Sequence, residues 1–115
     1  MTNEKQQNDG WTNFETWAIS SWLNKNETTR ERWAMTARRC LSEAHKSEKF
    51  KSKVWTREEA ETYGLSNLLE EHFRFQCPLP EDSPYRLLLI TAMGYVNWDE
   101  VADHLLSNVR KQSDE

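Results

Sequence analysis

Helix starts recur along this chain, and their number most constrains its fold. In a capping box, a Thr or Asn side chain accepts a hydrogen bond from the first helical turn, and a Glu three residues later returns one. The pattern occurs four times, at Thr12–Glu15, Thr28–Glu31, Thr56–Glu59 and Asn97–Glu100. A fifth start has Ser83 as the cap and Pro84 at the first helical position, which requires no N–H donor. The sequence therefore predicts an all-α fold, a compact bundle of about five short helices.

Apolar periodicity agrees with these starts. Residues 33–44 and residues 98–109 each place their apolar side chains on one helical stripe, with charged side chains opposite. Val96 precedes the second of these segments and is spaced to pack on Val101 as a hydrophobic staple. Both segments are therefore expected to be amphipathic helices that face a common core.

Two other segments are less regular. Residues 56–75 carry an apolar stripe that is offset at Gly64, which predicts either a bent helix or a short helix followed by a longer one. Residues 84–93 are apolar nearly all round, which favours a buried helix that stops at a left-handed Gly94. A buried strand is the alternative there, because the run is short.

The polar ends of the chain bound the domain. The chain has 115 residues, enough for one domain with one modest core. Residues 1–10 and 110–115 lack an apolar period and are expected to be disordered tails, so residues 11–109 form the single helical domain. No apolar run approaches a membrane span or follows the first Met as a leader, so we expect a cytoplasmic protein without membrane contact.

Aromatic residues gather in the first expected helix. Residues 10–23 hold three Trp and one Phe, and the apolar side chains cover roughly two thirds of the helical wheel. The favoured interpretation is a central helix packed on two sides. The alternative is a helix packed on one side, with rings left for a partner. Trp17, Trp22 and, from the last helix, Trp98 are the candidate protein-binding residues.

The spacing of the soft ligands argues against a metal site. Cys40 and His45, and likewise His72 and Cys77, are five residues apart, whereas zinc ligands come in tighter pairs. The two cysteines are expected to be reduced thiols rather than a disulfide. No nucleophile elbow, phosphate loop or dinucleotide fingerprint is present. We therefore expect no metal site, no cofactor and no catalytic residues.

A basic segment supports a second interpretation. Residues 30–57 carry nine Lys and Arg against three Glu, a net charge of +6, whereas residues 58–84 carry −6. Basic groups interleaved with aromatic rings can follow a nucleic-acid backbone. A solvated helix face whose charge offsets the acidic segment is the simpler explanation. The candidate nucleic-acid-binding residues are Arg32, Arg39, Lys46, Lys49, Lys51, Lys53 and Trp55.

Two tryptophan-containing segments resemble a known pattern. "NFETW" at residues 13–17 and "VNWDEVADHLL" at residues 96–106 are similar to the start and the ending of small uncharacterised proteins of phages, plasmids and bacterial genomes. Those proteins pair Asn-aromatic-Glu-Thr-Trp with Asp/Asn-Trp-x-x-Ile/Val-Ala-x-His-Leu. The match covers about a seventh of the chain. The resemblance implies a mobile-element or accessory context and carries no established activity.

These observations favour a function in binding. We expect a small non-enzymatic accessory protein of phage or plasmid origin that binds a host or element-encoded protein. If the protein is phage-encoded, its location is the host cell cytoplasm. The alternative is a nucleic-acid-binding protein that uses residues 30–57.

Overall fold

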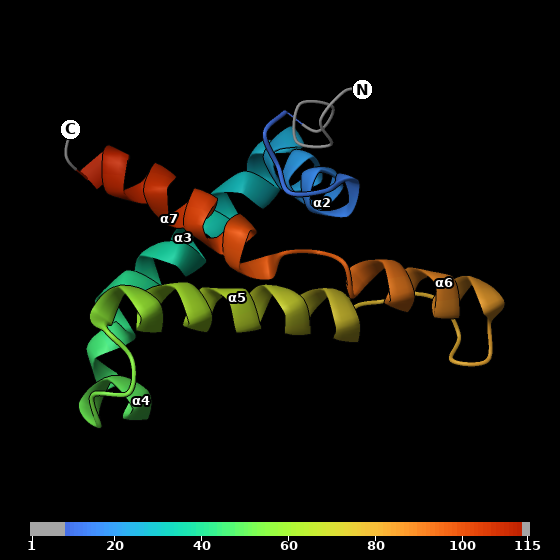
Figure 1. The fold of residues 1–115 in the computed structure, drawn as a ribbon. Coiled ribbons are helices and arrows are strands. Elements are labelled where there is room, and N and C mark those ends of the chain that lie inside the picture. The colour runs from blue at the N-terminus through green and yellow to red at the C-terminus, as the bar shows by residue number, and fades with distance from the viewer. Residues whose placement is uncertain (1–8, 114–115) are drawn as a thin grey trace.

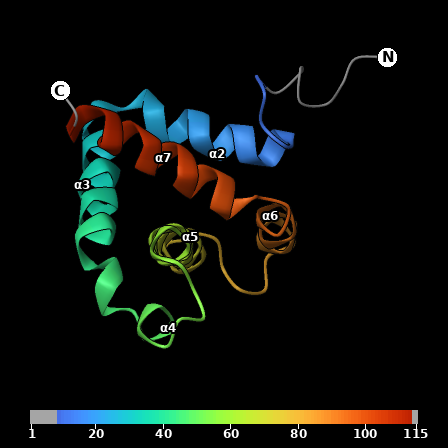
Figure 2. The same cartoon turned by 60° about the vertical axis from the view of Figure 1, so that its left-hand side comes forward.

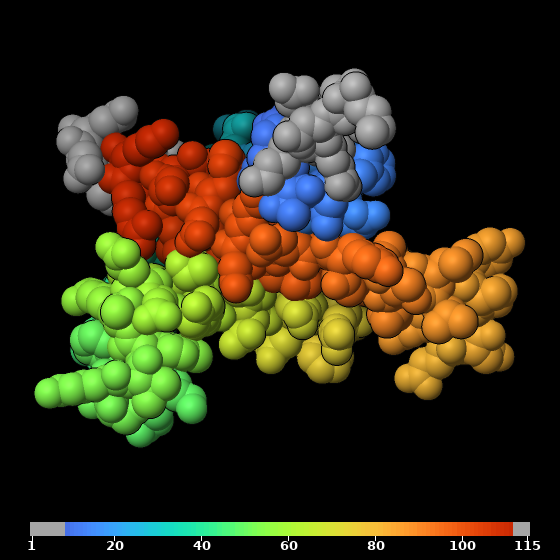
Figure 3. All heavy atoms as spheres, viewed as in Figure 1, coloured from blue at the N-terminus to red at the C-terminus, as the bar shows by residue number. Residues whose placement is uncertain are grey.

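The computed structural model describes residues 9–113 and is all-α, as the sequence predicts. Figure 1 shows α2, α3, α5 and α7 packed together, with α6 at one end of the molecule, where Figure 3 also shows it. A short 3₁₀ turn and a short helix connect α3 to α5. The described residues contain helices α2 (Phe14–Lys25), α3 (Glu27–Glu43), η1 (Ala44–Lys46), α4 (Glu48–Lys51), α5 (Arg57–Phe75), α6 (Pro84–Met93) and α7 (Trp98–Ser113). The sequence predicted five helices, and the described residues contain one further short helix, α4.

The last helix, α7, is the centre of the fold. It packs against α2, α3 and α5, and Figure 2 shows it lying between α2 and α5. Its apolar stripe is buried as predicted, and Val96 and Val101 both belong to the core. The core consists of Leu23, Trp33, Ala37, Leu65, Leu69, Met93, Val96, Trp98, Val101, Ala102, Leu105, Leu106 and Val109. The prediction that the aromatic helix α2 is central was wrong, because α7 takes that position.

The helix caps are only partly those predicted. Thr56 and Glu59 form the complete capping box of α5, and the Ser83 side chain caps α6 by accepting from the Tyr85 N–H. The other Thr predictions were wrong. Asn13 caps α2 in place of Thr12, and Asn26 caps α3 in place of Thr28. Helix α2 begins later than Thr12 predicts, and α3 begins earlier than Thr28 predicts. In each case an Asn with extended backbone precedes the first helical residue and caps the helix.

The segment from α5 to α6 differs from expectation in three ways. The α5 helix is continuous through Gly64, so the alternative of two successive helices was wrong. Gly94 has a right-handed backbone with φ of −66°, not the left-handed stop predicted. Most of α6 is exposed, so the buried helix was also wrong, and a strand is not formed there. Met93 is the one buried residue of α6. The helices α5 and α7 pack directly on each other, so their apolar faces are already covered without α6.

The domain extends further toward the C-terminus than expected. Helix α7 continues through Arg110 to Ser113, beyond the predicted boundary at Val109. The Arg110 guanidinium donates to the buried Glu61 carboxylate at 2.6 Å, which fixes this last turn to α5. A disordered tail from residue 110 was therefore wrong for residues 110–113. The other tail residues, 1–8 and 114–115, lie outside the described part of the chain.

No helix within the described residues is both long and apolar enough to cross a membrane. The longest helix, α5, has 19 residues but carries charged side chains along its length.

Candidate functional site

The aromatic helix α2 is packed on one side. Its buried residues are Thr16, Ser20 and Leu23, which follow one another at helical spacing and face the rest of the bundle. The small side chains at 16 and 20 allow α2 to lie close to its neighbours. The large rings consequently point elsewhere, with Phe14 exposed by 58% and Trp22 by 52%. This arrangement is the alternative that the sequence left open, a helix with rings facing solvent.

The three rings of α2 are held by different partners. Trp17 is half-buried, and its indole N–H donates to the Asp9 carboxylate at 3.0 Å. The Phe14 ring lies against Trp17 with centroids 5.4 Å apart. Trp22 meets Phe73 of α5 edge to face at 5.9 Å. The rings therefore have defined positions on the surface and are not free to rotate as isolated side chains.

A hollow lies beside these rings. It has a volume of about 560 Å³ and is lined by Trp17, Ala18, Ser21, Trp22, Asn24 and Lys25. All of its lining comes from α2, so it is a surface depression along one helix. Its chemistry is that of two aromatic walls with an amide, a hydroxyl and one cation at the edge. We define Phe14, Trp17 and Trp22 as the α2 aromatic face.

The third tryptophan candidate is a core residue. Trp98 is only 7% exposed, and its ring stacks on Phe73 at 5.6 Å. Its assignment as a protein-binding residue was wrong, because the Trp98 side chain is directed into the core. Trp98 still has a relation to the α2 aromatic face. Phe73 lies between Trp98 and Trp22, contacting both rings, so the exposed Trp22 is supported from the core.

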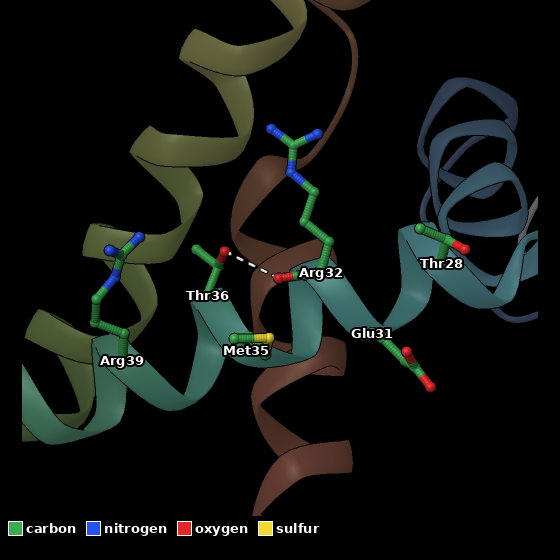
Figure 4. A pocket seen from close by; sticks show the side chains of 6 residues that line it. All are labelled: Thr28, Glu31, Arg32, Met35, Thr36 and Arg39. Carbon is green, nitrogen blue, oxygen red and sulfur yellow. Dashed lines mark hydrogen bonds between the residues drawn. The ribbon is translucent and has the colours of Figure 1, made fainter.

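The basic candidates are spread over several elements. Figure 4 shows Arg32 and Arg39 standing on one side of α3, with Glu31 on the other side. They line a hollow of about 520 Å³ together with Thr28, Glu31, Met35 and Thr36. Lys46 lines a separate hollow of about 400 Å³ with Trp55. Arg32 and Arg39 therefore line the same hollow, and Lys46 lines a different one.

The remaining basic candidates surround α4. Lys49 and Lys51 are exposed on that helix, and Lys53 is exposed in the turn after it, with φ of 64°. Trp55 is half-buried and meets Tyr63 edge to face at 5.1 Å. The Trp55 ring is therefore partly engaged within the protein, and it is less available for base stacking than the sequence suggested.

An acidic hollow opens between α5 and α7. It has a volume of about 360 Å³ and is lined by Glu58, Glu59, Thr62, Tyr63, Asp99 and Asp103. The Glu59 carboxylate is the main cause that raises the pKa of the Tyr63 phenol, followed by desolvation and Asp99. The two aspartates come from a distant part of the sequence, so their meeting with Glu58 and Glu59 follows only from the packing of α7 on α5.

The cysteine and histidine residues were the candidate metal ligands in the sequence. Within residues 9–113, no group of three or more His, Cys, Asp and Glu side chains is arranged to hold a metal ion. Cys40 and Cys77 are free thiols, and burial raises the pKa of Cys40. Desolvation is the main cause that lowers the pKa of His72 and of His104. These rings pack on aromatic neighbours, His72 against Trp33 and Phe73.

The two tryptophan-containing segments, residues 13–17 and 96–106, meet in the structure. The Asn13 side-chain amide donates to the Tyr95 carbonyl at 2.7 Å, just before the second segment. The Asn97 N–H donates to the Thr16 hydroxyl at 2.9 Å. The two segments that carry the sequence resemblance are therefore one structural unit, which fixes the start of α2 to the start of α7.

Comparison with known proteins adds no relative. No protein-family model matches the chain, and neither curated proteins nor solved structures show a significant match to it. The candidate surfaces are accordingly judged on their own chemistry.

Proposed function

We propose that this protein is a small non-enzymatic accessory protein of phage or plasmid origin. In this proposal it acts in the cytoplasm of the host cell by binding a host or element-encoded protein. The resemblance of residues 13–17 and 96–106 supports the mobile-element origin. The α2 aromatic face supports the binding activity, and it is the surface through which we expect the partner to dock.

One observation carries the proposal, the exposure of Trp22 by 52% beside a hollow of about 560 Å³. Trp is enriched among the residues that supply most of the binding energy at protein interfaces. A ring that is held in place costs little conformational entropy when a partner covers it. The contact of Trp22 with Phe73 provides that support, because Phe73 is in turn stacked on the core residue Trp98.

The chemistry of the hollow defines the kind of partner segment. Two aromatic walls favour an apolar side chain from the partner, and Lys25 at the edge favours a neighbouring carboxylate. A short protein segment with an apolar anchor followed by an acidic residue has this character. The expected interface is small, because its lining comes from one helix.

The test is capture with matched variants. The purified protein serves as bait in a lysate of the bacterial host, beside Trp22→Gln and Met35→Gln. Met35 is exposed by 68% on α3, so its variant removes exposed apolar surface elsewhere. We expect a protein that wild type and Met35→Gln retain and that Trp22→Gln loses. With that partner purified, Trp22→Gln should raise Kd by at least about tenfold.

The same variants also define the result that would contradict the proposal. If circular dichroism shows that Trp22→Gln is folded and it retains every protein that wild type retains, the α2 aromatic face is not the binding surface. Phe14→Gln gives a second variant on this face, because Phe14 is exposed by 58%.

Nucleic-acid binding remains a second candidate, favoured by the common orientation of Arg32 and Arg39 on α3 (Figure 4). Each Lys or Arg contact to a phosphate releases counterions, so binding should weaken steeply with salt. Anisotropy titration of single-stranded and duplex DNA at low salt tests this. The double variant Arg39→Gln, Lys51→Gln should flatten the salt slope. The double variant Lys25→Gln, Lys111→Gln removes equal charge outside residues 30–57 and should not. Absence of binding at low salt rejects this candidate.

A further inference from the structure

Helix α3 has one side that no element of the described residues covers. Trp33 and Ala37 are buried on its inner side, where it packs against α2, α5 and α7. Seven residues on its outer side are exposed, and they recur at spacings of three and four residues from the first turn to the last. We call them the α3 outer face, and they are Thr28, Glu31, Arg32, Met35, Arg38, Arg39 and Ser42.

The α3 outer face is long and narrow. From Thr28 to Ser42 the helix rises by about 21 Å, at about 1.5 Å per residue. Figure 2 shows α3 along one edge of the molecule, with α2 at one end of it and α4 at the other. An α-helix with its side chains is about 10–12 Å across, and the major groove of B-DNA is about 12 Å wide. The exposed side of α3 therefore has the dimensions of a helix that enters this groove.

Arginine side chains lie on both sides of an apolar ridge on this face. The ridge is Met35, which is exposed by 68%. Arg32 and Arg39 line the hollow of about 520 Å³ on one side of it, and Figure 4 shows Glu31 on the other side. Arg38 lines a second hollow, of about 500 Å³, with Glu31. The face carries three arginines and one glutamate, although the whole chain has a net charge of −4. A helix in a groove has phosphates on both sides, and this arrangement provides cations for both.

We propose that α3 is a recognition helix that binds in the major groove of duplex DNA through its outer face. This inference rests on the nucleic-acid candidate described above and names its ligand. An arginine reads guanine by donating two hydrogen bonds, to O6 and N7. Arg32 and Arg39 are seven residues apart, roughly 10 Å along the helix axis, which equals about three base-pair steps of about 3.4 Å. The two side chains can therefore reach guanines about three base pairs apart.

The residues between these arginines have the chemistry of other base edges. Met35 is apolar and can contact the C5-methyl group of thymine, which lies in the major groove. The Glu31 carboxylate can accept from the N4 amino group of cytosine. An acidic protein segment offers no such donor and would place a like charge against Glu31. The α3 outer face therefore fits base edges better than it fits an acidic protein.

The lysines that follow α3 are placed to contact phosphates. Lys46, Lys49, Lys51 and Lys53 are all exposed, and they lie in η1, in α4 and in the turn after it. Figure 1 shows α4 beyond the end of α3, where the backbone that borders the groove would pass. Phosphate contacts orient a protein on the duplex and carry no sequence information. In this arrangement α3 reads the bases and the lysines around α4 hold the backbone.

The aromatic residues of the basic segment favour duplex over single-stranded DNA. Proteins that bind single strands stack the bases on aromatic side chains. Phe50 and Trp55 are the rings near the lysines, and both are half-buried. Trp55 is also engaged edge to face with Tyr63. The exposed part of the segment consists of hydrogen-bond donors rather than stacking surfaces, which suits a groove.

Selection from a duplex library tests the proposal. Duplexes with a random central segment are selected on the full chain at low salt and then titrated by fluorescence anisotropy. We expect the selected duplexes to share guanines about three base pairs apart and to bind at least about tenfold more tightly than scrambled ones. Replacing these guanines by 7-deazaguanine removes the N7 acceptor but keeps the base pairing, and it should remove this preference. Duplex RNA of the same sequence should bind more weakly, because side chains cannot enter its narrow major groove.

Matched variants separate base reading from phosphate contact. Arg39→Gln should lose the preference for one of the two guanines, because it removes the two donors that read it. Lys51→Gln should weaken binding to all duplexes evenly and reduce the salt dependence. Lys111→Gln, which removes a charge from an exposed side chain of α7, is the control and should change neither property. All three residues are exposed, so each variant should keep the circular dichroism of wild type.

The outcomes distinguish this inference from the proposals on which it builds. If no DNA is bound at low salt, both this inference and the nucleic-acid candidate are rejected. Preference for single strands, or equal binding to all duplexes with no effect of 7-deazaguanine, overturns the recognition helix and leaves the nucleic-acid candidate standing. An acidic protein that Met35→Glu and Arg39→Gln both fail to hold would also overturn it and assign the face to that protein. Trp22→Gln lies outside the α3 outer face, so the α2 aromatic face is tested independently.

Discussion

The Thr16 hydroxyl on α2 and the Asn97 backbone N–H at the start of α7 are joined by a hydrogen bond of 2.9 Å, 81 residues apart in the sequence. The same hydroxyl donates to the Asn13 side chain at 2.6 Å. In a complete capping box, Glu100 would return a bond to the Asn97 N–H. Instead the Glu100 carboxylate accepts from the Thr12 N–H at 3.2 Å. The cap of α7 is therefore completed by α2.

Replacing Thr16 by Val should consequently destabilise the fold. The methyl group keeps the volume but leaves the Asn97 N–H and the Asn13 side-chain Oδ1 without this partner. Because Thr16 is fully buried, we expect a loss of about 1–3 kcal/mol in the free energy of unfolding. Urea denaturation measures it. The control is Thr36→Val, whose hydroxyl donates only to the Arg32 carbonyl in its own helix. Equal stability of the two variants would contradict the role of Thr16.

The two threonines of the predicted capping boxes should behave differently. Thr56→Ala removes the acceptor for the Glu59 N–H and should cost about 1 kcal/mol. Thr28→Ala should leave the melting temperature nearly unchanged, because Asn26 accepts from the Thr29 N–H and caps α3. Asn26→Ala should instead show the loss. A lower melting temperature for Thr28→Ala than for Asn26→Ala would show that α3 begins at the Thr.

The ion pair between Glu61 and Arg110 should stabilise the last turns of α7. The Glu61 side chain is only 9% exposed and that of Arg110 is 42% exposed. Removing one partner of a buried pair costs several kcal/mol, and solvent around Arg110 together with Arg57 at 3.7 Å reduces this. We expect about 1–2 kcal/mol for Arg110→Met by urea denaturation. Lys111→Met is the neighbouring control. A double variant with Glu61→Gln should lose less than the two single losses together.

Acid should weaken the fold through His72. Desolvation, and secondly Arg32, lower the pKa of His72 below its ordinary value of 6.5. Between that value and the lower pKa of the folded state, the unfolded chain binds more protons, so stability rises with pH. The contribution is fully present above pH 6.5 and is lost as the pH falls through this window. When the pH falls from about 7.5 to about 5.5, the free energy of unfolding of His72→Gln should therefore decrease less than that of wild type.

The control for the pH experiment is the exposed His45. His45→Gln should follow the wild-type curve of urea midpoint against pH. If His72→Gln loses as much stability on acidification as wild type, the half-buried imidazole of His72 is not the cause.

Local patterns predicted those parts of the fold that depend on neighbours in sequence. The cap at Thr56, the Ser83 start and the stripe of α7 each involve residues within a few positions, and the structure has them. Which face of α2 is buried does not depend only on how its apolar residues are distributed around the helix. Thr16 and Ser20 are small polar residues on that wheel, and they are buried because α7 lies against them. Tertiary packing therefore reversed the inside and outside of the aromatic helix.

The candidate site shows the same division. The sequence identified Trp17 and Trp22 as candidates, and Trp22 is indeed exposed, but it could not separate them from the buried Trp98. It did not predict the exposed Leu87 and Leu88, because an apolar run without charges is the usual mark of a buried helix. Whether α6 is buried depends on which other elements pack against it, and the pattern of residues 84–93 does not determine that packing.

The central position of α7 has a consequence for synthesis. Translation proceeds from the N-terminus, so α2, α3 and α5 leave the ribosome before the helix on which all three pack. Until residues 98–113 emerge, Leu65, Leu69 and Ala37 lack their main apolar neighbours and are exposed to chaperones and proteases. Packing of α2, α3 and α5 around α7 accordingly waits for residues 98–113, and a ribosome that stalls ahead of α7 leaves these three helices without the central helix of the core.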